Sequence, residues 1–165
     1  MHDFDEGLFV AGTLMKLSLY SDYAMRVMIH LAAKDEDLTS IREVAAIYGI
    51  SQNHLMKVVQ DLAGSGFIDA VRGRNGGIRL ARPAQDINLG ALLRHTEKLT
   101  DLFVCDGCII APACGLPVVL KEATAAFVGV FDRYTLEDVA KKKSDLAALL
   151  RIVSAEQQAL PGTTN

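Results

Sequence analysis

The chain lacks the features that mark several common functional classes. It has 165 residues, half of them hydrophobic, yet no apolar run reaches the roughly 18 to 20 residues that a membrane-spanning helix needs. Its first 14 residues hold three acidic side chains and no lysine or arginine, whereas a secretory signal opens with positive charge. These absences favour a cytoplasmic protein without a membrane partner.

Signatures of catalysis are equally scarce. No Ser/His/Asp arrangement, pair of carboxylates or phosphate-binding loop of the G-x-x-x-x-G-K kind stands out. The length and the hydrophobic content suit one folded domain with an additional oligomerising element. We therefore expect a binding protein and not an enzyme.

Positive charge is scarce overall but concentrated in one place. The net charge is −3, and residues 1–14 alone account for it; residues 15–82 carry +2 and residues 83–165 carry −2. Within residues 71–82 there is no acid, and four side chains are positive: Arg72, Arg74, Arg79 and Arg82. Such a local stripe is typical of a surface that binds nucleic acid.

Hydrophobic periodicity predicts three helices in the first half of the chain. The first is expected to begin at Asp22, with Ser21 or Asp22 as its cap. The second follows Ser40 and stops at Gly49, and the third follows Ser51, which gives a helix-turn-helix. The expected core positions are Ala24, Val27, Met28, Leu31, Ile41, Val44, Ala45, Tyr48, Leu55, Val58, Val59 and Leu62.

Two short strands, 67–72 and 78–82, flank a tip rich in glycine and arginine, which predicts a hairpin wing. Residues 116–131 form a helix too apolar for a lone surface helix, so its expected use is dimerisation. The predicted fold is mainly α, a winged helix-turn-helix with a two-strand wing plus a long C-terminal dimerisation helix. The expected division is a disordered leader 1–14, a DNA-binding domain 15–83, a connecting helix and cysteine loop 84–115, the dimerisation helix and a final helix from Thr135 in 116–150, and a tail 151–165.

The third helix and the wing carry the candidate DNA contacts. Polar side chains at the start of a recognition helix match base edges in the major groove, while arginines and glycines of a wing suit close approach to the phosphate backbone. The candidates are Ser51, Gln52, Asn53, His54, Lys57, Arg72, Arg74, Asn75 and Arg79. The alternative is a protein-protein module whose arginines form a solvated face.

Three cysteines lie within ten residues, in the pattern C-x2-C-x5-C: Cys105, Cys108 and Cys114. An odd number of cysteines in a chain without an export signal argues against structural disulfides. Thiolates are soft ligands for iron-sulfur clusters, zinc or copper(I), and three of them leave one coordination position open, which suits a sensor. Zinc with a fourth ligand and plain thiols are the alternatives, as is an electron carrier.

Five stretches make the chain resemble a known family. Residues 15–150 are similar to the nitric-oxide-sensing repressors of the NsrR type, within the Rrf-type family of winged-helix regulators that also includes the iron-sulfur regulator IscR. The stretches are SDYAMR (21–26), YGISQNHLMK (48–57), VRGRNGGIRL (71–80), IAPACGL (110–116) and FDRYTLED (131–138). The last two favour the NsrR branch.

The resemblance implies a homodimer that binds a double-stranded, near-palindromic DNA operator and releases it when nitric oxide reacts with an iron-sulfur cluster. It implies that Cys105, Cys108 and Cys114 hold the cluster and that Asp22 of the partner subunit supplies the fourth ligand. Capping of the first helix or an ion pair with Arg26 is the alternative role for Asp22.

The expected cluster is 4Fe-4S, with 2Fe-2S as the alternative. Only two residues separate Cys105 from Cys108, fewer than NsrR-type chains have, although bacterial ferredoxins use the same spacing. A regulator of the same fold that senses iron supply, cluster status or redox state is the competing function, and a protein-interaction module without a cluster is another.

Overall fold

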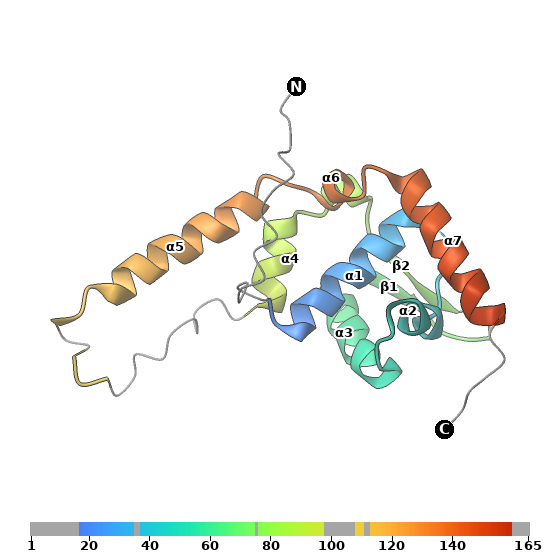
Figure 1. The fold of residues 1–165 in the computed structure, drawn as a ribbon, viewed down its shortest axis with the longest axis horizontal. Coiled ribbons are helices and arrows are strands. Elements are labelled where there is room, and N and C mark those ends of the chain that lie inside the picture. Colours follow the sequence, from blue (N-terminus) through green and yellow to red (C-terminus); the bar gives the residue numbers. More distant parts are fainter. Residues whose placement is uncertain (1–16, 35–36, 75, 98–107, 111–112, 160–165) are drawn as a thin grey trace.

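The computed structural model describes residues 17–34, 37–74, 76–97, 108–110 and 113–159 (Figure 1). Within these ranges the fold is mainly helical, with one two-stranded sheet, as the sequence predicts. The elements are α1 (Leu19–Ala33), α2 (Ile41–Tyr48), α3 (Gln52–Gly64), β1 (Ile68–Val71), β2 (Gly77–Leu80), the 3-10 turn η1 (Ala84–Asp86), α4 (Leu89–Thr96), α5 (Leu116–Phe131), α6 (Leu136–Val139) and α7 (Lys143–Ala159).

Helix α1 begins earlier than the sequence pattern indicated. The Ser18 side chain accepts a hydrogen bond from the backbone N–H of Ser21 at 3.2 Å, so Ser18 is the N-cap and the helix starts at Leu19. The predicted start at Asp22 is therefore wrong by three residues. Ser21 is fully buried, and Asp22 lies in the first turn, where a negative charge favours the helix dipole.

The helix-turn-helix has the predicted form. Ser40 caps α2 by accepting from the Glu43 N–H, and Gly49 ends it in the left-handed conformation at φ 62°. Helix α3 follows directly and packs against α1 and α2. Ser51 is the N-cap residue of α3, but its side chain makes no capping hydrogen bond. The predicted core positions of α1 and α3 are all buried: Ala24, Val27, Met28, Leu31, Leu55, Val58, Val59 and Leu62.

The wing is an antiparallel hairpin in which Ile68 pairs with Leu80 and Val71 with Gly77. Thr39, just before α2, forms an isolated bridge to this sheet by exchanging two backbone hydrogen bonds with Ile78, at 3.0 and 2.8 Å. A Cβ atom at Gly77 would lie 2.8 Å from the Thr39 carbonyl oxygen, so this approach requires glycine. The wing is thereby fixed to the helix-turn-helix.

The C-terminal part differs from the expected single helix. Thr135 and Asp138 form the predicted capping box, but the helix they start, α6, ends at Val139, and a separate helix, α7, begins at Lys143. The reason is burial: Leu136 and Ala140 are held in the core around α1, while α7 has to turn to pack on α1 and α2. Helix α7 also runs to Ala159, past residue 150, where the tail was expected to begin.

Helix α5 projects from the rest of the protein (Figure 1). It spans the predicted residues, and Val128 is its one buried residue among sixteen that are all described. Its exposed apolar side chains include Leu116, Val118, Val119 and Val130. In the described part of the chain, no helix is both long enough and apolar enough to cross a membrane.

His30 is an unusual member of the core. It lies on α1, is fully buried, and neither of its ring nitrogens has a hydrogen-bond partner among the described residues. Its ring makes an edge-to-face contact with Tyr48 at a centroid distance of 5.8 Å. Burial lowers the pKa of His30 to about 4, with Lys34 contributing in the same direction and Glu43 opposing it.

This burial predicts an acid-sensitive fold. Because the unfolded chain binds a proton at His30 near pH 6.5 and the folded chain does not, the stabilising contribution is complete above pH 6.5 and is lost as the pH falls toward 4. The loss at His30 amounts to at most about 3 kcal/mol. Urea unfolding of the wild type and of His30→Leu at pH 7.5 and pH 4.5 measures it. The two proteins should converge in stability at low pH or cross over, and an equal loss in both would contradict the assignment to His30.

Candidate nucleic-acid interface and metal centre

The outer face of α3 is polar and exposed. Gln52, Asn53, His54 and Lys57 are all exposed, on the side of the helix away from the core. Because α3 packs against α1 and α2, the position of this face is fixed relative to those helices. Together they offer hydrogen-bond donors and acceptors of the kind that match base edges.

Ser51 stands at the start of the same helix. It is exposed, and its hydroxyl group is not used for capping. The first backbone N–H groups of α3 and the positive end of its dipole lie beside this hydroxyl. This arrangement suits a phosphate oxygen of a DNA backbone.

The arginines of the wing are exposed at Arg72, Arg74 and Arg79. Arg79 has a nearby acid, with 3.8 Å between its Nε and the Asp69 Oδ2, and both side chains are about half exposed, so this pair contributes little. Arg82 differs because its guanidinium lies over the Phe67 ring, 5.4 Å from the centroid. Asn75, the remaining predicted wing contact, lies outside the described residues.

Glycine is required at the tip of the wing. Gly73 has φ 116°, a conformation that other residues rarely adopt. A Cβ atom at Gly76 would lie 2.2 Å from the Val71 carbonyl oxygen. The narrow hairpin that carries the arginines therefore depends on these two positions.

Sequence reasoning missed two features of this face. Met56 on α3 is half exposed, although the helical pattern alone gives no reason to expect an exposed apolar side chain at that position. An apolar side chain of this kind suits contact with a thymine methyl group. Asp61, also on α3, accepts a hydrogen bond from the Tyr20 hydroxyl group and lies 2.7 Å from His95 Nε2. No spacing rule connects residues so far apart in the chain.

The Asp61 contacts join three helices. Tyr20 lies on α1, Asp61 on α3 and His95 on α4. The hydrogen bond from Tyr20, with further help from His95, holds the pKa of Asp61 below its usual value, while burial and the carboxylate raise the pKa of Tyr20 to about 12. The recognition helix is thus tied to the helix that leads into the cysteine loop.

Two of the three predicted cysteine ligands are described, and both are free thiols. Cys108 is exposed and Cys114 is partly buried. Cys114 directly precedes Gly115, the N-cap of α5. Cys105 lies outside the described residues. Among the residues that are described, no three His, Cys, Asp or Glu side chains gather closely enough to hold a metal ion.

Asp22 pairs with Arg26 in this structure. The Arg26 Nε donates to the Asp22 Oδ2 at 2.8 Å, which is the helical i, i+4 pair considered for it from the sequence. The hydrogen bond that Arg26 donates to Asp22 raises the pKa of Arg26, and the guanidinium also lies over the Tyr48 ring, 5.9 Å from its centroid. Both side chains remain partly exposed, so the Asp22 carboxylate is accessible from outside the chain.

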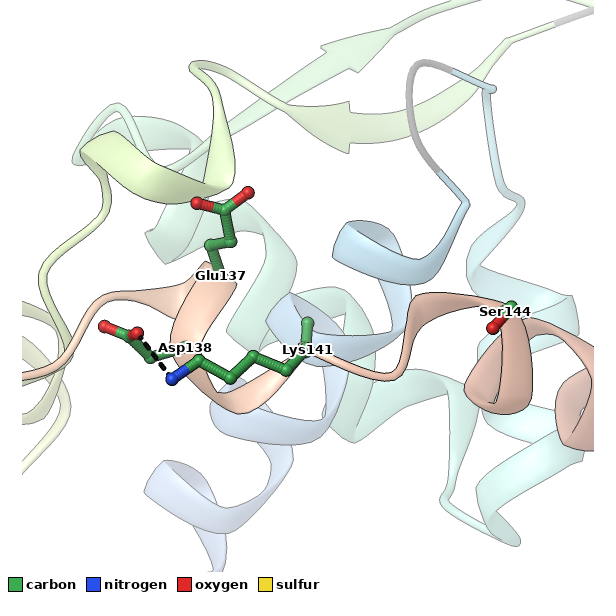
Figure 2. Close-up of a pocket in the computed structure, with 5 residues that line it drawn as sticks. Glu137, Asp138, Lys141 and Ser144 are labelled. Carbon is green, nitrogen blue, oxygen red and sulfur yellow. Dashed lines mark ion pairs between the residues drawn. The ribbon is translucent and has the colours of Figure 1, made fainter. Parts of the chain in front are cut away.

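A shallow hollow near α6 offers no comparable site. Its lining includes Glu137, Asp138, Lys141 and Ser144 (Figure 2). The charged groups within it largely satisfy one another, because Lys141 pairs with Asp138 at 3.2 Å. Asp138 in addition caps α6, which lowers its pKa through the backbone hydrogen bond at Thr135.

Comparisons with known proteins agree with this geometry. The profile of the Rrf2 family, described as an iron-dependent transcriptional regulator, matches residues 17–142. The HTH-type transcriptional regulator NsrR of Bacillus subtilis is 44% identical over 84% of this chain and 99% of its own length. NsrR of Halalkalibacterium halodurans is 42% identical, over 84% of this chain and 99% of its own.

Solved structures give the same fold. CymR, the global cysteine regulator of B. subtilis, superposes with a TM-score of 0.61 at 27% identity, over 78% of this chain and 98% of its own. IscR of T. potens superposes with a TM-score of 0.62 at 25% identity, over 78% of this chain and 88% of its own.

These matches confirm three predictions: the resemblance, the mainly helical winged fold, and a regulator in place of an enzyme. Iron dependence follows from the family at that coarse level, and so does DNA binding. With an exposed recognition helix and an arginine wing carried on a matching fold, the chain belongs to the Rrf2 family of iron-dependent, DNA-binding transcriptional regulators.

Proposed function

We propose that this regulator is a cytoplasmic, homodimeric repressor that binds a DNA operator and releases it in response to nitric oxide through an iron-sulfur cluster. The observation that carries the proposal is the placement of an exposed polar helix face and an arginine wing on one rigid unit, from which an uncovered apolar helix projects. Its relatives at 42 to 44% identity are named NsrR, which supports the branch of the family.

The DNA contacts divide between α3 and the wing. Gln52, Asn53, His54 and Lys57 face the major groove, with Ser51 and the N-terminus of α3 against a phosphate. Arg72, Arg74, Arg79 and Asn75 follow the backbone beside them. Two such units related by twofold symmetry read the two halves of a near-palindromic operator.

The dimer forms through α5. Its exposed valines and leucine lie on a helix that touches the rest of its own chain mainly at its C-terminal end. A stripe of this kind is unfavourable in water and is covered when two copies pair. The pairing leaves both recognition helices free.

The donor set fits an iron-sulfur cluster. Cys108 and Cys114 are free thiols, and the second lies at the positive end of α5. With Cys105 they would provide three soft ligands, for 4Fe-4S or alternatively for 2Fe-2S. When bound, the cluster supplies iron atoms that react with nitric oxide.

Asp22 has two uses in this proposal. Its carboxylate would serve as a ligand to iron held by the partner subunit, and without that iron it would form the 2.8 Å pair with Arg26. Because Asp22 and Tyr20 share the first turns of α1, and Tyr20 bonds to Asp61, a change at Asp22 acts on the recognition helix through two side chains. A repressor requires only a few kcal/mol of differential affinity to pass from bound to released.

A second candidate is a regulator of the same fold that senses iron supply or redox state. The family description as iron-dependent favours it. Cluster reactivity separates the two candidates: a fast, stoichiometric reaction with nitric oxide and a slow one with oxygen supports the nitric oxide sensor.

Base contacts and phosphate contacts are expected to respond differently to salt. Arg72→Ala should reduce the slope of log affinity against log salt by about 0.9, because one fewer phosphate is neutralised. Asn53→Ala should leave the slope unchanged and weaken binding to the specific operator by about 1 to 3 kcal/mol. Fluorescence anisotropy at several salt concentrations measures both. Lys142→Ala, which removes an exposed charge before α7, is the control and should change neither quantity.

Loss of one thiolate should abolish sensing. Cys114→Ala is expected to purify without colour or iron under anaerobic conditions and to fail to repress, because two thiolates cannot retain the cluster. Iron content, absorbance and a promoter-reporter assay provide the measurements. Ile109→Ala changes a neighbouring, almost fully exposed side chain without ligand chemistry and should behave as the wild type. A Cys114→Ala protein that still represses and still responds to nitric oxide would falsify the proposal.

If Asp22 alternates between iron and Arg26, removing the arginine should favour the cluster-bound form. Arg26→Gln is expected to lengthen the half-life of the cluster absorbance by up to about fivefold, since an exposed i, i+4 pair contributes no more than about 1 kcal/mol. Asp22→Ala should shorten it. Equal half-lives in the wild type and both variants would remove Asp22 from the ligand set.

A further inference from the structure

We infer that the contact between α4 and the end of α5 sets the direction in which α5 leaves the DNA-binding unit, and that it thereby determines which separation of operator half-sites the dimer accepts. The inference rests on the proposed function, because it requires a dimer paired through α5. We call this contact the α4–α5 junction; it consists of Asn88, Gly90, Arg94 and Asp132.

Asp132 is held by two side chains of the α4 region. Its carboxylate accepts two hydrogen bonds from the Arg94 guanidinium, at 2.6 Å from Nη1 and 2.5 Å from Nη2. Its backbone carbonyl accepts one from Asn88 Nδ2 at 2.8 Å. Asn88 also caps α4 by accepting from the Ala91 N–H. Asn88, which caps the start of α4, therefore also bonds to the end of α5.

Gly90 allows the two helices to meet at this point. A Cβ atom there would lie 2.0 Å from the Asp132 Oδ1 and 2.9 Å from its backbone nitrogen. The first contact is with a side chain that can move, but the second is with the backbone of the last turn of α5. Any larger residue at position 90 must push that turn away from α4.

The chain after the junction is fixed to the core as well. The Leu89 N–H donates to the Tyr134 carbonyl oxygen at 3.0 Å, and the Leu136 N–H donates to the Ile87 carbonyl oxygen at 2.8 Å. Leu136 is fully buried among the residues around α1. The base of α5 is thus anchored to the same core that holds the recognition helix.

Among the described residues, the rest of α5 has no comparable anchor, and it projects from the protein like a lever (Figure 1). Its length follows from its 16 residues and is about 24 Å. A tilt of about 10° at the base moves the far end by about 4 Å, which is close to the 3.4 Å rise per base along one DNA strand. Leu116, Val118 and Val119 lie in the far half, so a change at the junction alters the distance between the two recognition helices of a dimer.

The Arg94–Asp132 pair is better suited to fixing the direction of α5 than to stabilising the fold. Arg94 and Asp132 are both partly exposed, and exposed pairs contribute little to stability. A two-pronged hydrogen bond between a guanidinium and a carboxylate is nevertheless strongly directional. Removing this pair should leave the fold intact and allow the angle between α4 and α5 to vary.

The test measures spacing preference with the full-length protein, purified without oxygen. Wild-type protein first selects its operator from a random pool of duplex DNA, and one or two base pairs are then inserted or deleted at the operator centre. We expect the wild type to lose at least tenfold in affinity for each change. Arg94→Gln and Asp132→Asn should lose less than threefold, and Gly90→Ala should prefer a changed spacing. Affinity for an isolated half-site should stay within twofold of wild type in all three.

Arg133→Gln is the matched control, because it removes a positive charge one residue from Asp132, where no ion pair is seen among the described residues. It should keep the wild-type profile. If Arg94→Gln and Asp132→Asn keep that profile too, or weaken binding to every spacing equally with a lower melting temperature, the inference is overturned. If the wild type itself selects no DNA or binds as a monomer, the proposed function has failed instead.

Discussion

Burial of α1 is the constraint on which the other elements depend. Ala24, Val27, Met28 and Leu31 are almost fully excluded from water, and α1 touches α3, α4, α6, α7 and β2. Because packed interiors resist small displacements, each of these elements has a fixed position relative to α1. The recognition helix, the wing and the anchor of α5 therefore form one rigid unit, and a change at either end of α1 reaches all three.

Polar contacts at the edge of this core restrict the angles between its helices. Asp61 joins α3 to α1 and α4, and Asp132 joins α5 to α4, in both cases through carboxylates that remain partly exposed. Contacts of this type contribute little to the free energy of folding, but they restrict angles between helices. A regulator needs this combination, since its domain must stay folded while the relation between its parts changes.

Helix α5 stands outside this arrangement. Its apolar side chains Leu116, Val118, Val119 and Val130 are exposed, and Cys114 lies just before its N-cap. In the proposed function, a cluster ligand precedes the start of this helix, its exposed apolar side chains form the dimer contact, and the α4–α5 junction lies at its end. A dimer paired through α5, as proposed, would account for a segment that is so hydrophobic and yet so little buried within its own chain.

The sequence by itself determined the local elements. The helical i, i+3, i+4, i+7 spacing of Ala24, Val27, Met28 and Leu31 predicted the first helix. Gly49 and the arginine-rich tip predicted the turn and the wing, because these features depend on residues close together in the chain. The spacing of the three cysteines likewise favours soft-ligand chemistry, which stays a prediction. The prediction failed where several local signals competed. The first helix is capped by Ser18 and not by Ser21 or Asp22. The expected final helix is divided in two because Leu136 and Ala140 are buried in the core.

Only the tertiary structure decided which distant residues meet. Gly90 faces Asp132 and Tyr20 bonds to Asp61, although the members of each pair are far apart in the sequence. His30 is buried with no hydrogen-bond partner among the described residues. Such contacts arise from how helices cross, and no periodicity within a single helix encodes a crossing. The sequence therefore determined the local elements, and the packing around α1 determined which of their residues contact one another.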